Sequence, residues 1–155
     1  MNTVRTVLQA KSGPVWTIRH DATVYEALRV MADKDIGALL VQNREGKLVG
    51  VFSERDYARK VILKGRSSRD TLVSELMSDV VYYVSPDHTV NDCMAIMTTK
   101  RIRHIPVMEG ESLKGIITIG DVVNSMLSEQ NITIRDLENY ITGGVREFDV
   151  VQSAK

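Results

Sequence analysis

Two short stretches of the sequence place a hydroxyl side chain and an aspartate three residues apart, directly after a hydrophobic run. GVFSERD contains Ser53 and Asp56, and GIITIGD contains Thr118 and Asp121. A hydroxyl followed three residues later by an acid is typical of a helix start, where both side chains accept from free backbone N–H groups. An ionised carboxylate at a helix start can also accept hydrogen bonds from a ligand, and the helix N-terminus can bind an anion. The motif therefore indicates helix capping, ligand binding or both.

Motifs for other chemistry are absent from the sequence. There is no G-x-G-x-x-G, and Gly110 and Gly115 have P-loop spacing but are followed by Ile116 where a lysine is required. The sequence has no H-E-x-x-H and no G-x-S-x-G, and its three histidines are too scattered for a metal cluster. We therefore expect no catalytic residue, no metal site, no catalytic cofactor and no enzymatic activity.

The two hydroxyl-x-x-Asp motifs belong to an internal repeat. The stretch 21–41 aligns with 87–107 at one constant offset, which pairs Asp21 with Asp87 and Lys34 with Lys100. After a single deletion the alignment continues, and 46–56 lies on 111–121. The same unit is thus present twice, and such self-similarity decides the architecture before single elements are assigned.

Within each unit the apolar periodicity predicts the same order of elements. Apolar residues at i, i+3, i+4 and i+7 over 24–31 and 90–97 predict an amphipathic helix. Two short runs rich in aliphatic residues follow, joined by a glycine-bearing loop as in a hairpin, and a second helix begins at the motif. A short apolar segment precedes each unit, at 14–18 and at 80–84. We expect an α+β fold of two pseudo-twofold β-α-β-β-α repeats packed by their sheets.

The chain divides into four parts on this pattern. Residues 10–63 form the first repeat, 64–79 a linker with a short helix, and 80–128 the second repeat. Residues 129–155 form a C-terminal helix, over TIRDLENYI, and a tail. Since a single unit of this size buries little surface, two units that cover each other's apolar face should form one module.

The composition limits the partners of the protein. The chain has 155 residues, 43% of them hydrophobic and 26% charged, which is typical of a globular domain. Its 20 basic and 20 acidic residues cancel, so no global field attracts nucleic acid or a membrane surface. No run is apolar for long enough to be a signal peptide or a membrane span, and we expect a cytoplasmic protein. Cys93 falls on a helix face predicted to be buried, as a packed thiol.

The tandem unit resembles a pair of cystathionine-β-synthase (CBS) domains, the arrangement called a Bateman module, over roughly residues 10–128. The matching stretches are TVYEALRVMADKDIGALLVQNREGKLVGVFSERD and TVNDCMAIMTTKRIRHIPVMEGESLKGIITIGD. The resemblance implies a regulatory module that binds AMP, ADP, ATP or NAD in clefts between the repeats. It also implies a homodimer and, as a further partner, an unidentified regulated enzyme. The stretch after the second repeat is too short for an enzyme, so we expect a stand-alone module.

Several candidate nucleotide-binding residues follow from this resemblance. Arg103 and His104 precede the proline-containing strand of the second repeat and are expected at the phosphates. The small pair Gly37 and Ala38, next to Ile36, is expected to leave room for the base. Strand positions that lead into each repeat are expected near the adenine, and these are Thr17 and Tyr82.

The two motifs themselves differ in charge. Arg55 lies inside the first motif, with Arg59 one turn later, and both are either phosphate ligands or exposed surface arginines. Because Glu54 and Arg55 crowd Asp56 with charge, while Ile119 and Gly120 leave Asp121 open, we expect Asp121 to be the better ribose site. The remaining alternatives are a ligand-free dimerisation scaffold, which has no need of cations beside a cleft, and a small nucleotide-acting enzyme, which lacks a nucleophile or metal site.

Overall fold

The computed structural model describes residues 2–129 and residue 138. The first helix of each repeat begins at a threonine that completes a capping box. Thr23 caps α2 (Val24–Lys34) together with Glu26, and Thr89 caps α5 (Val90–Lys100) in the same way. Both helices have eleven residues, and each buries three of the four apolar residues that the periodicity predicts. The fourth is partly buried in α2, at Leu28, and 36% exposed in α5, at Met94.

These two helices also end alike. The residue after α2 is Asp35, with φ 54°, and the residue after α5 is Arg101, with φ 55°. Left-handed backbone normally favours glycine, so both ends hold a non-glycine residue in a costly conformation. Each end leads directly into the next strand, which places Gly37 and Arg103 at matching positions.

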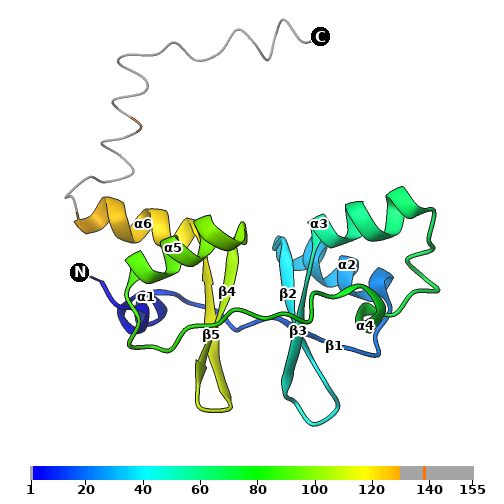
Figure 1. Ribbon diagram of the computed structural model, residues 1–155, viewed down its shortest axis with the longest axis horizontal. Helices are drawn as coiled ribbons and strands as arrows, with labels where there is room; N and C mark the ends of the chain where they lie inside the picture. The colour runs from blue at the N-terminus through cyan, green and yellow to red at the C-terminus, as the bar shows by residue number, and fades with distance from the viewer. Residues whose placement is uncertain (1, 130–137, 139–155) are drawn as a thin grey trace, which may run out of the picture.

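The strands form two small sheets, one in each repeat. In the first, β1 (Thr17–Arg19) runs parallel to β2 (Ala38–Gln42), which pairs antiparallel with β3 (Leu48–Ser53). In the second, β4 (His104–Glu109) and β5 (Ser112–Thr118) form an antiparallel pair. The two hairpin turns point the same way, away from α3, α5 and α6 (Figure 1).

The predicted strand over residues 80–84 is wrong as a strand: a single parallel bridge joins Val84 to Val107. Val84 donates to the Pro106 carbonyl at 3.1 Å and accepts from the Met108 N–H at 2.8 Å. In a parallel ladder the next bond would run from the N–H of residue 106 to the carbonyl of Tyr82, but proline has no N–H. Leu40 occupies the matching position of the first repeat, where a full strand forms.

A second helix follows each hairpin. In the first repeat α3 (Glu54–Asp56) continues as a π-helical turn over Tyr57–Val61 and a tighter turn over Ile62–Lys64. In the second repeat α6 spans Ile119–Glu129. The predicted helix over TIRDLENYI lies outside the described residues, apart from Glu138.

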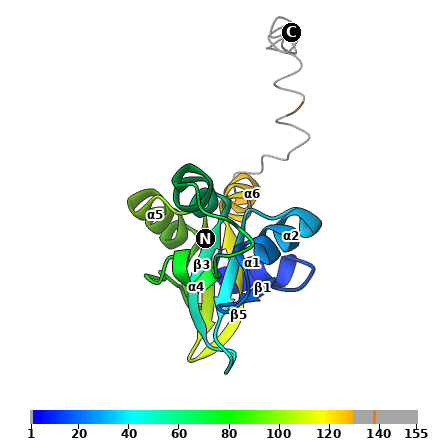
Figure 2. The same cartoon turned by 90° about the vertical axis from the view of Figure 1, so that its right-hand side faces the viewer.

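Two short helices each precede one repeat in the sequence but pack against the other repeat. α4 (Val73–Leu76) packs in the core of the first repeat, and α1 (Val4–Ala10), which the sequence analysis did not predict, packs in the core of the second. Matching backbone bonds hold them, from Val90 N–H to the Asn2 carbonyl at 3.0 Å and from Val24 N–H to the Thr71 carbonyl at 2.8 Å. Each repeat is therefore completed by the segment that precedes the other, and α1 lies beside β4, β5 and α6 (Figures 1 and 2).

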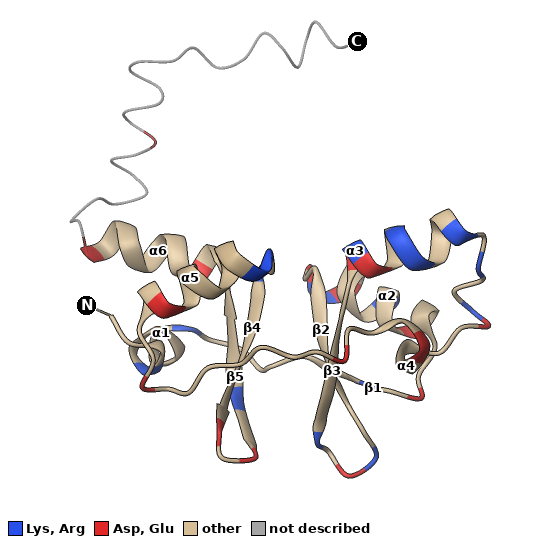
Figure 3. Ribbon diagram, viewed as in Figure 1, with Lys and Arg blue, Asp and Glu red and all other residues tan. Residues whose placement is uncertain are grey.

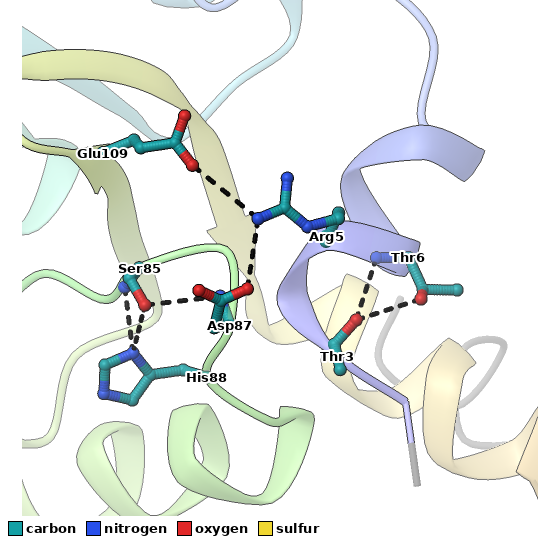
Figure 4. A network of polar contacts seen from close by, with 7 residues as sticks. All are labelled: Thr3, Arg5, Thr6, Ser85, Asp87, His88 and Glu109. Atoms are coloured by element: carbon teal, nitrogen blue, oxygen red, sulfur yellow. Dashed lines mark hydrogen bonds and ion pairs between the residues drawn. The ribbon is translucent and has the colours of Figure 1, made fainter.

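Surface ion pairs also hold α1 against the second repeat (Figure 4). Arg5 lies 3.1 Å from Asp87 Oδ1 and 3.7 Å from Glu109 Oε2. In the same region His88 Nδ1 accepts from the backbone N–H of Ser85 at 3.0 Å, in the turn that leads into α5. Exposed pairs of this kind contribute little free energy, so the docking of α1 depends mainly on the burial of Val4 in the core.

The core consists of two apolar clusters, one in each repeat. Cys93 is buried in the second cluster, and desolvation raises the pKa of its thiol to about 11, which confirms the packed thiol predicted from the helix pattern. The segments that contain α1 and α4 approach the two sheets closely at the glycine with which each motif begins. Met77 lies over Gly50, and Leu8 lies over Gly115, so that neither glycine has space for a β-carbon.

Candidate functional site

A cleft of about 1020 Å³ lies between the two repeats, next to the first hydroxyl-x-x-Asp motif. Its walls are the start of α3, the start of β2, the segment 78–82 and the chain from the end of α5 into β4. Nine of the residues predicted at a nucleotide site line it: Gly37, Ala38, Ser53, Arg55, Asp56, Arg59, Tyr82, Arg103 and His104. We call this the Asp56 cleft.

The other five predicted residues do not line the Asp56 cleft. Thr17 begins β1 and pairs with Leu40, and Ile36 packs against the core of the first repeat. Thr118, Ile119 and Asp121 form the matching junction of the second repeat, where β5 meets α6. The predicted set therefore divides into one cleft with many members and a second junction with few.

At the Asp56 cleft the motif caps the helix, which confirms that part of the interpretation. The Ser53 N–H and Oγ donate to Asp56 Oδ2 at 3.0 and 3.1 Å, and the Asp56 N–H donates to Ser53 Oγ at 3.2 Å. The other carboxylate oxygen, Oδ1, lies 3.3 Å from the Lys60 ammonium, whose side chain is 45% exposed. Capping thus uses Oδ2, while Oδ1 faces the half-exposed Lys60 ammonium, which also donates to the Leu76 carbonyl at 3.2 Å.

Positive charge is concentrated at this cleft. Six arginines and lysines line it against two acids, although the charges of the whole chain cancel. Four of the six come from the first helix of one repeat and the second helix of the other: Arg55, Arg59, Lys60 and Lys100. Figure 3 shows basic residues on α3 and at the end of α5, on facing sides of the two lobes. A local field of this kind attracts anions with several charges.

His104 lies in the wall of the cleft at the start of β4. Burial lowers the pKa of its imidazole, and the nearby charges of Arg103 and Lys11 lower it further, while Asp121 acts in the opposite direction. The ring is therefore neutral near pH 7, where it can donate one hydrogen bond and accept another. A β-carbon on Gly37 would lie 3.9 Å from His104 Cε1, so this side of the cleft is narrow but not blocked.

Two cation–aromatic pairs occupy matching places in the two repeats. Lys100 lies over the ring of Tyr82 at 5.1 Å, and Lys34 lies over the ring of Trp16 at 4.3 Å. Each aromatic comes from a segment that crosses between repeats, and each lysine ends the first helix of a repeat. The sequence analysis did not name Lys100 among the candidate residues, although the alignment of Lys34 with Lys100 was a signal that the two lysines occupy matching places.

The Asp121 junction differs from the Asp56 cleft in what contacts the carboxylate. Asp121 Oδ2 accepts from the Thr118 N–H at 2.8 Å and from the Lys11 ammonium at 2.8 Å. The expectation that Asp121 is open was wrong in this respect: its sequence neighbours leave it uncrowded, but Lys11 reaches it from the segment after α1. The distance of 110 residues along the chain explains why local patterns did not indicate this contact.

Comparison with known proteins identifies the family to which the chain belongs. The family model of the CBS domain matches the chain twice, at residues 4–62 and 73–128. The chain belongs to the CBS domain family. A CBS domain pair is a regulatory module, and the α+β fold expected from the sequence is confirmed.

Three relatives illustrate the similarity. A mitochondrial CBS domain-containing protein of Arabidopsis thaliana is 40% identical over 128 residues, which cover 80% of this chain and 62% of the relative. A CBS-domain signal-transduction protein of Burkholderia ambifaria, described as putative, has a structure with a TM-score of 0.80 and 45% identity, covering 86% of this chain and 99% of that chain. A CBS domain pair solved with 5′-methylthioadenosine and S-adenosyl-L-methionine has a TM-score of 0.73 and 23% identity, covering 83% and 98%. The chain thus spans less than two thirds of the Arabidopsis protein.

Two kinds of feature, a membrane-spanning helix and a metal-binding cluster, are absent from the described residues of this CBS domain pair. Among them, no helix combines the length and the apolar character needed to cross a membrane. No group of three or more histidine, cysteine or acidic side chains lies close enough to hold a metal ion within residues 2–129.

Proposed function

We propose that this CBS domain pair binds an adenine nucleotide, AMP, ADP, ATP or NAD, in the Asp56 cleft and acts as a ligand or energy-state sensor without catalytic activity. One observation carries the proposal: a helix-start carboxylate and six cationic side chains face one cleft between the repeats. A nucleotide requires hydroxyl recognition at the ribose and charge neutralisation at the phosphates, and these two groups of side chains supply both. The cleft volume of about 1020 Å³ is also at the upper end of the usual range for ligand sites, about 300–1,000 Å³.

Each part of the nucleotide has a candidate partner. Asp56 Oδ1 accepts from the ribose hydroxyls, and Lys60 moves from this oxygen toward the phosphates. Arg55, Arg59 and Arg103 neutralise the phosphate charge. The ring of Tyr82 offers a flat face for adenine once Lys100 leaves it.

The position of the cleft supports regulation rather than simple storage. Its walls come from both repeats, so a bound ligand changes the free energy of their mutual arrangement. We propose that a homodimer transmits this change to a regulated enzyme in the cytoplasm. Exposed apolar side chains at the end of the second helix of the first repeat support the homodimer, since Ile62 is 56% exposed and Leu63 is 77% exposed.

A ligand-free dimerisation scaffold is the second candidate, and the same exposed apolar side chains favour it. A titration separates the two. Calorimetry with AMP, ADP, ATP, NAD and S-adenosylmethionine, with GTP and CTP as controls, should show binding of an adenine nucleotide and little of the others. Binding of every nucleotide with equal affinity would restrict the site to phosphate recognition, and no heat with any of them would favour the scaffold.

A further inference from the structure

Lys11 makes two short contacts at the second motif. Its ammonium donates to Asp121 Oδ2 at 2.8 Å and to the carbonyl oxygen of Ile116 at 2.8 Å. The side chain of Lys11 is only 31% exposed, and that of Asp121 only 17%. The side chain of Asp56 is equally protected, at 17% exposed, and Lys60 also donates to a backbone carbonyl, that of Leu76, but at 3.2 Å. Lys60 is 45% exposed and lies 3.3 Å from the carboxylate, so the Lys11 pair is closer and its lysine is better protected from water.

The segment that carries Lys11 is longer than its counterpart in the other repeat. Leu8 and Met77 occupy matching places, each over the strand glycine of its motif. The next matching residues are Ile18 and Val84, which make equivalent parallel pairs with β2 and β4. Ten positions separate Leu8 from Ile18, but only seven separate Met77 from Val84. Three extra residues therefore extend the segment after α1.

The first repeat has a backbone bridge at a position where the second repeat, with its longer segment, has a side-chain hydrogen bond. In the first repeat Ser78 and Val51 exchange two backbone hydrogen bonds, at 3.0 and 2.9 Å. Ile116 corresponds to Val51 in the second repeat, and its carbonyl accepts from the Lys11 ammonium instead. The same ammonium then reaches Asp121, so the replacement brings a positive charge to the carboxylate that a ribose would need.

We propose that Lys11 is a specificity-determining residue that excludes ribose from the Asp121 junction, so that the chain binds one nucleotide although it carries the motif twice. A neutral diol gains less from a carboxylate than an ammonium that is held by two charge-assisted bonds at 2.8 Å in a part-buried site. Lys60 makes the same two kinds of contact at 3.3 and 3.2 Å and is more exposed, so ribose displaces Lys60 from Asp56 more readily than it displaces Lys11 from Asp121. This inference rests on the nucleotide binding proposed above and determines which of the two motifs is used.

The surrounding charges agree with this division. The second motif has Gly120, Asn124 and Ser125 at the positions of Arg55, Arg59 and Lys60. Without those cations, a nucleotide at Asp121 would gain little at its phosphates, and Lys11 would remain the favoured partner of the carboxylate. A site opened by removal of Lys11 should accordingly be weaker than the Asp56 cleft.

The test is the number of nucleotides bound per chain. Isothermal titration with AMP, and separately with ATP, should give one site in the wild-type protein and two in Lys11→Gln. Lys11→Arg keeps the ion pair and should give one site. Lys114→Gln removes the same charge from an exposed position on β5 and should also give one. Adding Asp121→Asn to Lys11→Gln should return the number to one.

Trp16 provides a local signal, because it is the only tryptophan of the chain and matches Tyr82 of the Asp56 cleft. Its fluorescence should change when Lys11→Gln binds the second nucleotide and not when the wild-type protein binds the first. If Lys11→Gln is poorly folded by circular dichroism, Lys11→Met, which keeps the aliphatic stem, takes its place.

The outcomes separate this inference from the proposed function. One site in both the wild-type protein and Lys11→Gln would overturn the role of Lys11 and leave the Asp56 cleft as the binding site. Two sites in the wild-type protein would also overturn it. A single site that appears only in Lys11→Gln would support Lys11 but contradict binding at Asp56. No binding to any variant would overturn both.

Discussion

The guanidinium of Arg55 donates a hydrogen bond to the backbone carbonyl of Arg101 at 3.3 Å. Arg55 lies in the motif of the first repeat, and Arg101 follows the first helix of the second repeat in a left-handed conformation. The bond therefore joins the two walls of the Asp56 cleft. A phosphate that draws Arg55 toward itself would weaken this bond, so the ligand and the joint between the repeats compete for one side chain.

Replacement of Arg101 by glycine should separate the effect of backbone strain on stability from the effect of charge on nucleotide affinity. Left-handed backbone costs a non-glycine residue about 1–2 kcal/mol, and glycine loses about 0.5–1 kcal/mol through the entropy of the unfolded chain. Arg101→Gly should therefore leave the free energy of unfolding unchanged or raise it by up to about 1.5 kcal/mol, as measured by urea denaturation. Loss of a partly screened charge should weaken ATP binding about two- to fivefold. Asp35→Gly, at the matching position outside the cleft, should show no loss of affinity.

Asp56→Asn should weaken nucleotide binding while it preserves much of the capping box, since the asparagine amide oxygen can still accept from the Ser53 N–H. A hydrogen bond to a charged group contributes about 1.5–3 kcal/mol, so calorimetry should show an affinity loss of about 10- to 150-fold. Asp92→Asn changes the equivalent acid in the capping box of α5, outside the cleft, and serves as the control. Equal affinities for the two variants would show that Asp56 acts only as a cap.

The two motif glycines should differ in their tolerance of alanine. A β-carbon on Gly50 would lie 2.6 Å from Met77 Sδ and 2.8 Å from the Ser78 carbonyl oxygen, a backbone atom that cannot easily move. A β-carbon on Gly115 would meet mainly the end of the Leu8 side chain, at 2.7 Å. Gly50→Ala should cost about 1–3 kcal/mol of unfolding free energy, and Gly115→Ala less. The reverse order in urea denaturation would contradict this account.

His104 should make the stability depend on pH. Because burial lowers its pKa in the folded protein, the unfolded chain binds more protons below the unperturbed value of 6.5. Stability should therefore fall as the pH drops from about 6.5 toward the lowered pKa, and it should level off below that value. Urea denaturation from about pH 5 to pH 7.5 should show this slope, and the slope should be smaller in His104→Gln. An identical slope in both proteins would assign it to other groups.

The chain should form a homodimer. Leu63, with 77% of its surface exposed, and Val123, with 47%, lie on the second helices of the two repeats, where large apolar side chains favour association. Light scattering at micromolar concentration should give twice the chain mass of 17.4 kDa. Leu63→Lys should shift the mass toward the monomer. A wild-type mass equal to that of a single chain would exclude the dimer at that concentration.

Local patterns predicted most elements because each had its own periodicity and cap. The helix that begins after Thr23, the hairpins and the duplicated motif could all be identified in this way. α1 could not, since its short helix is stabilised by the burial of Val4 against a repeat that lies far along the chain. The strand before the second repeat failed for a different reason, because the effect of Pro106 depends on which residue lies opposite it.

The sequence analysis named nine of the residues that line the Asp56 cleft, but it did not predict which of the named residues lie together. Sequence reasoning treated Glu54 and Arg55 as charges that crowd Asp56, whereas the structure spreads them along a cleft that also contains Arg103. The partner of Asp121 is Lys11, and no periodicity of a single element relates residues that lie so far apart in the chain.

The crossing of α1 and α4 determines the order in which the chain can fold during synthesis. The first repeat has every segment it requires once α4 has left the ribosome, because α4 follows it directly. α1 is made before both repeats, but its binding surface lies on the second repeat, so the apolar side of α1 stays without its partner while the first repeat and α4 are translated. During that interval α1 is available to another copy of the chain, and exchange of α1 between two nascent chains would be a route to an interlinked dimer.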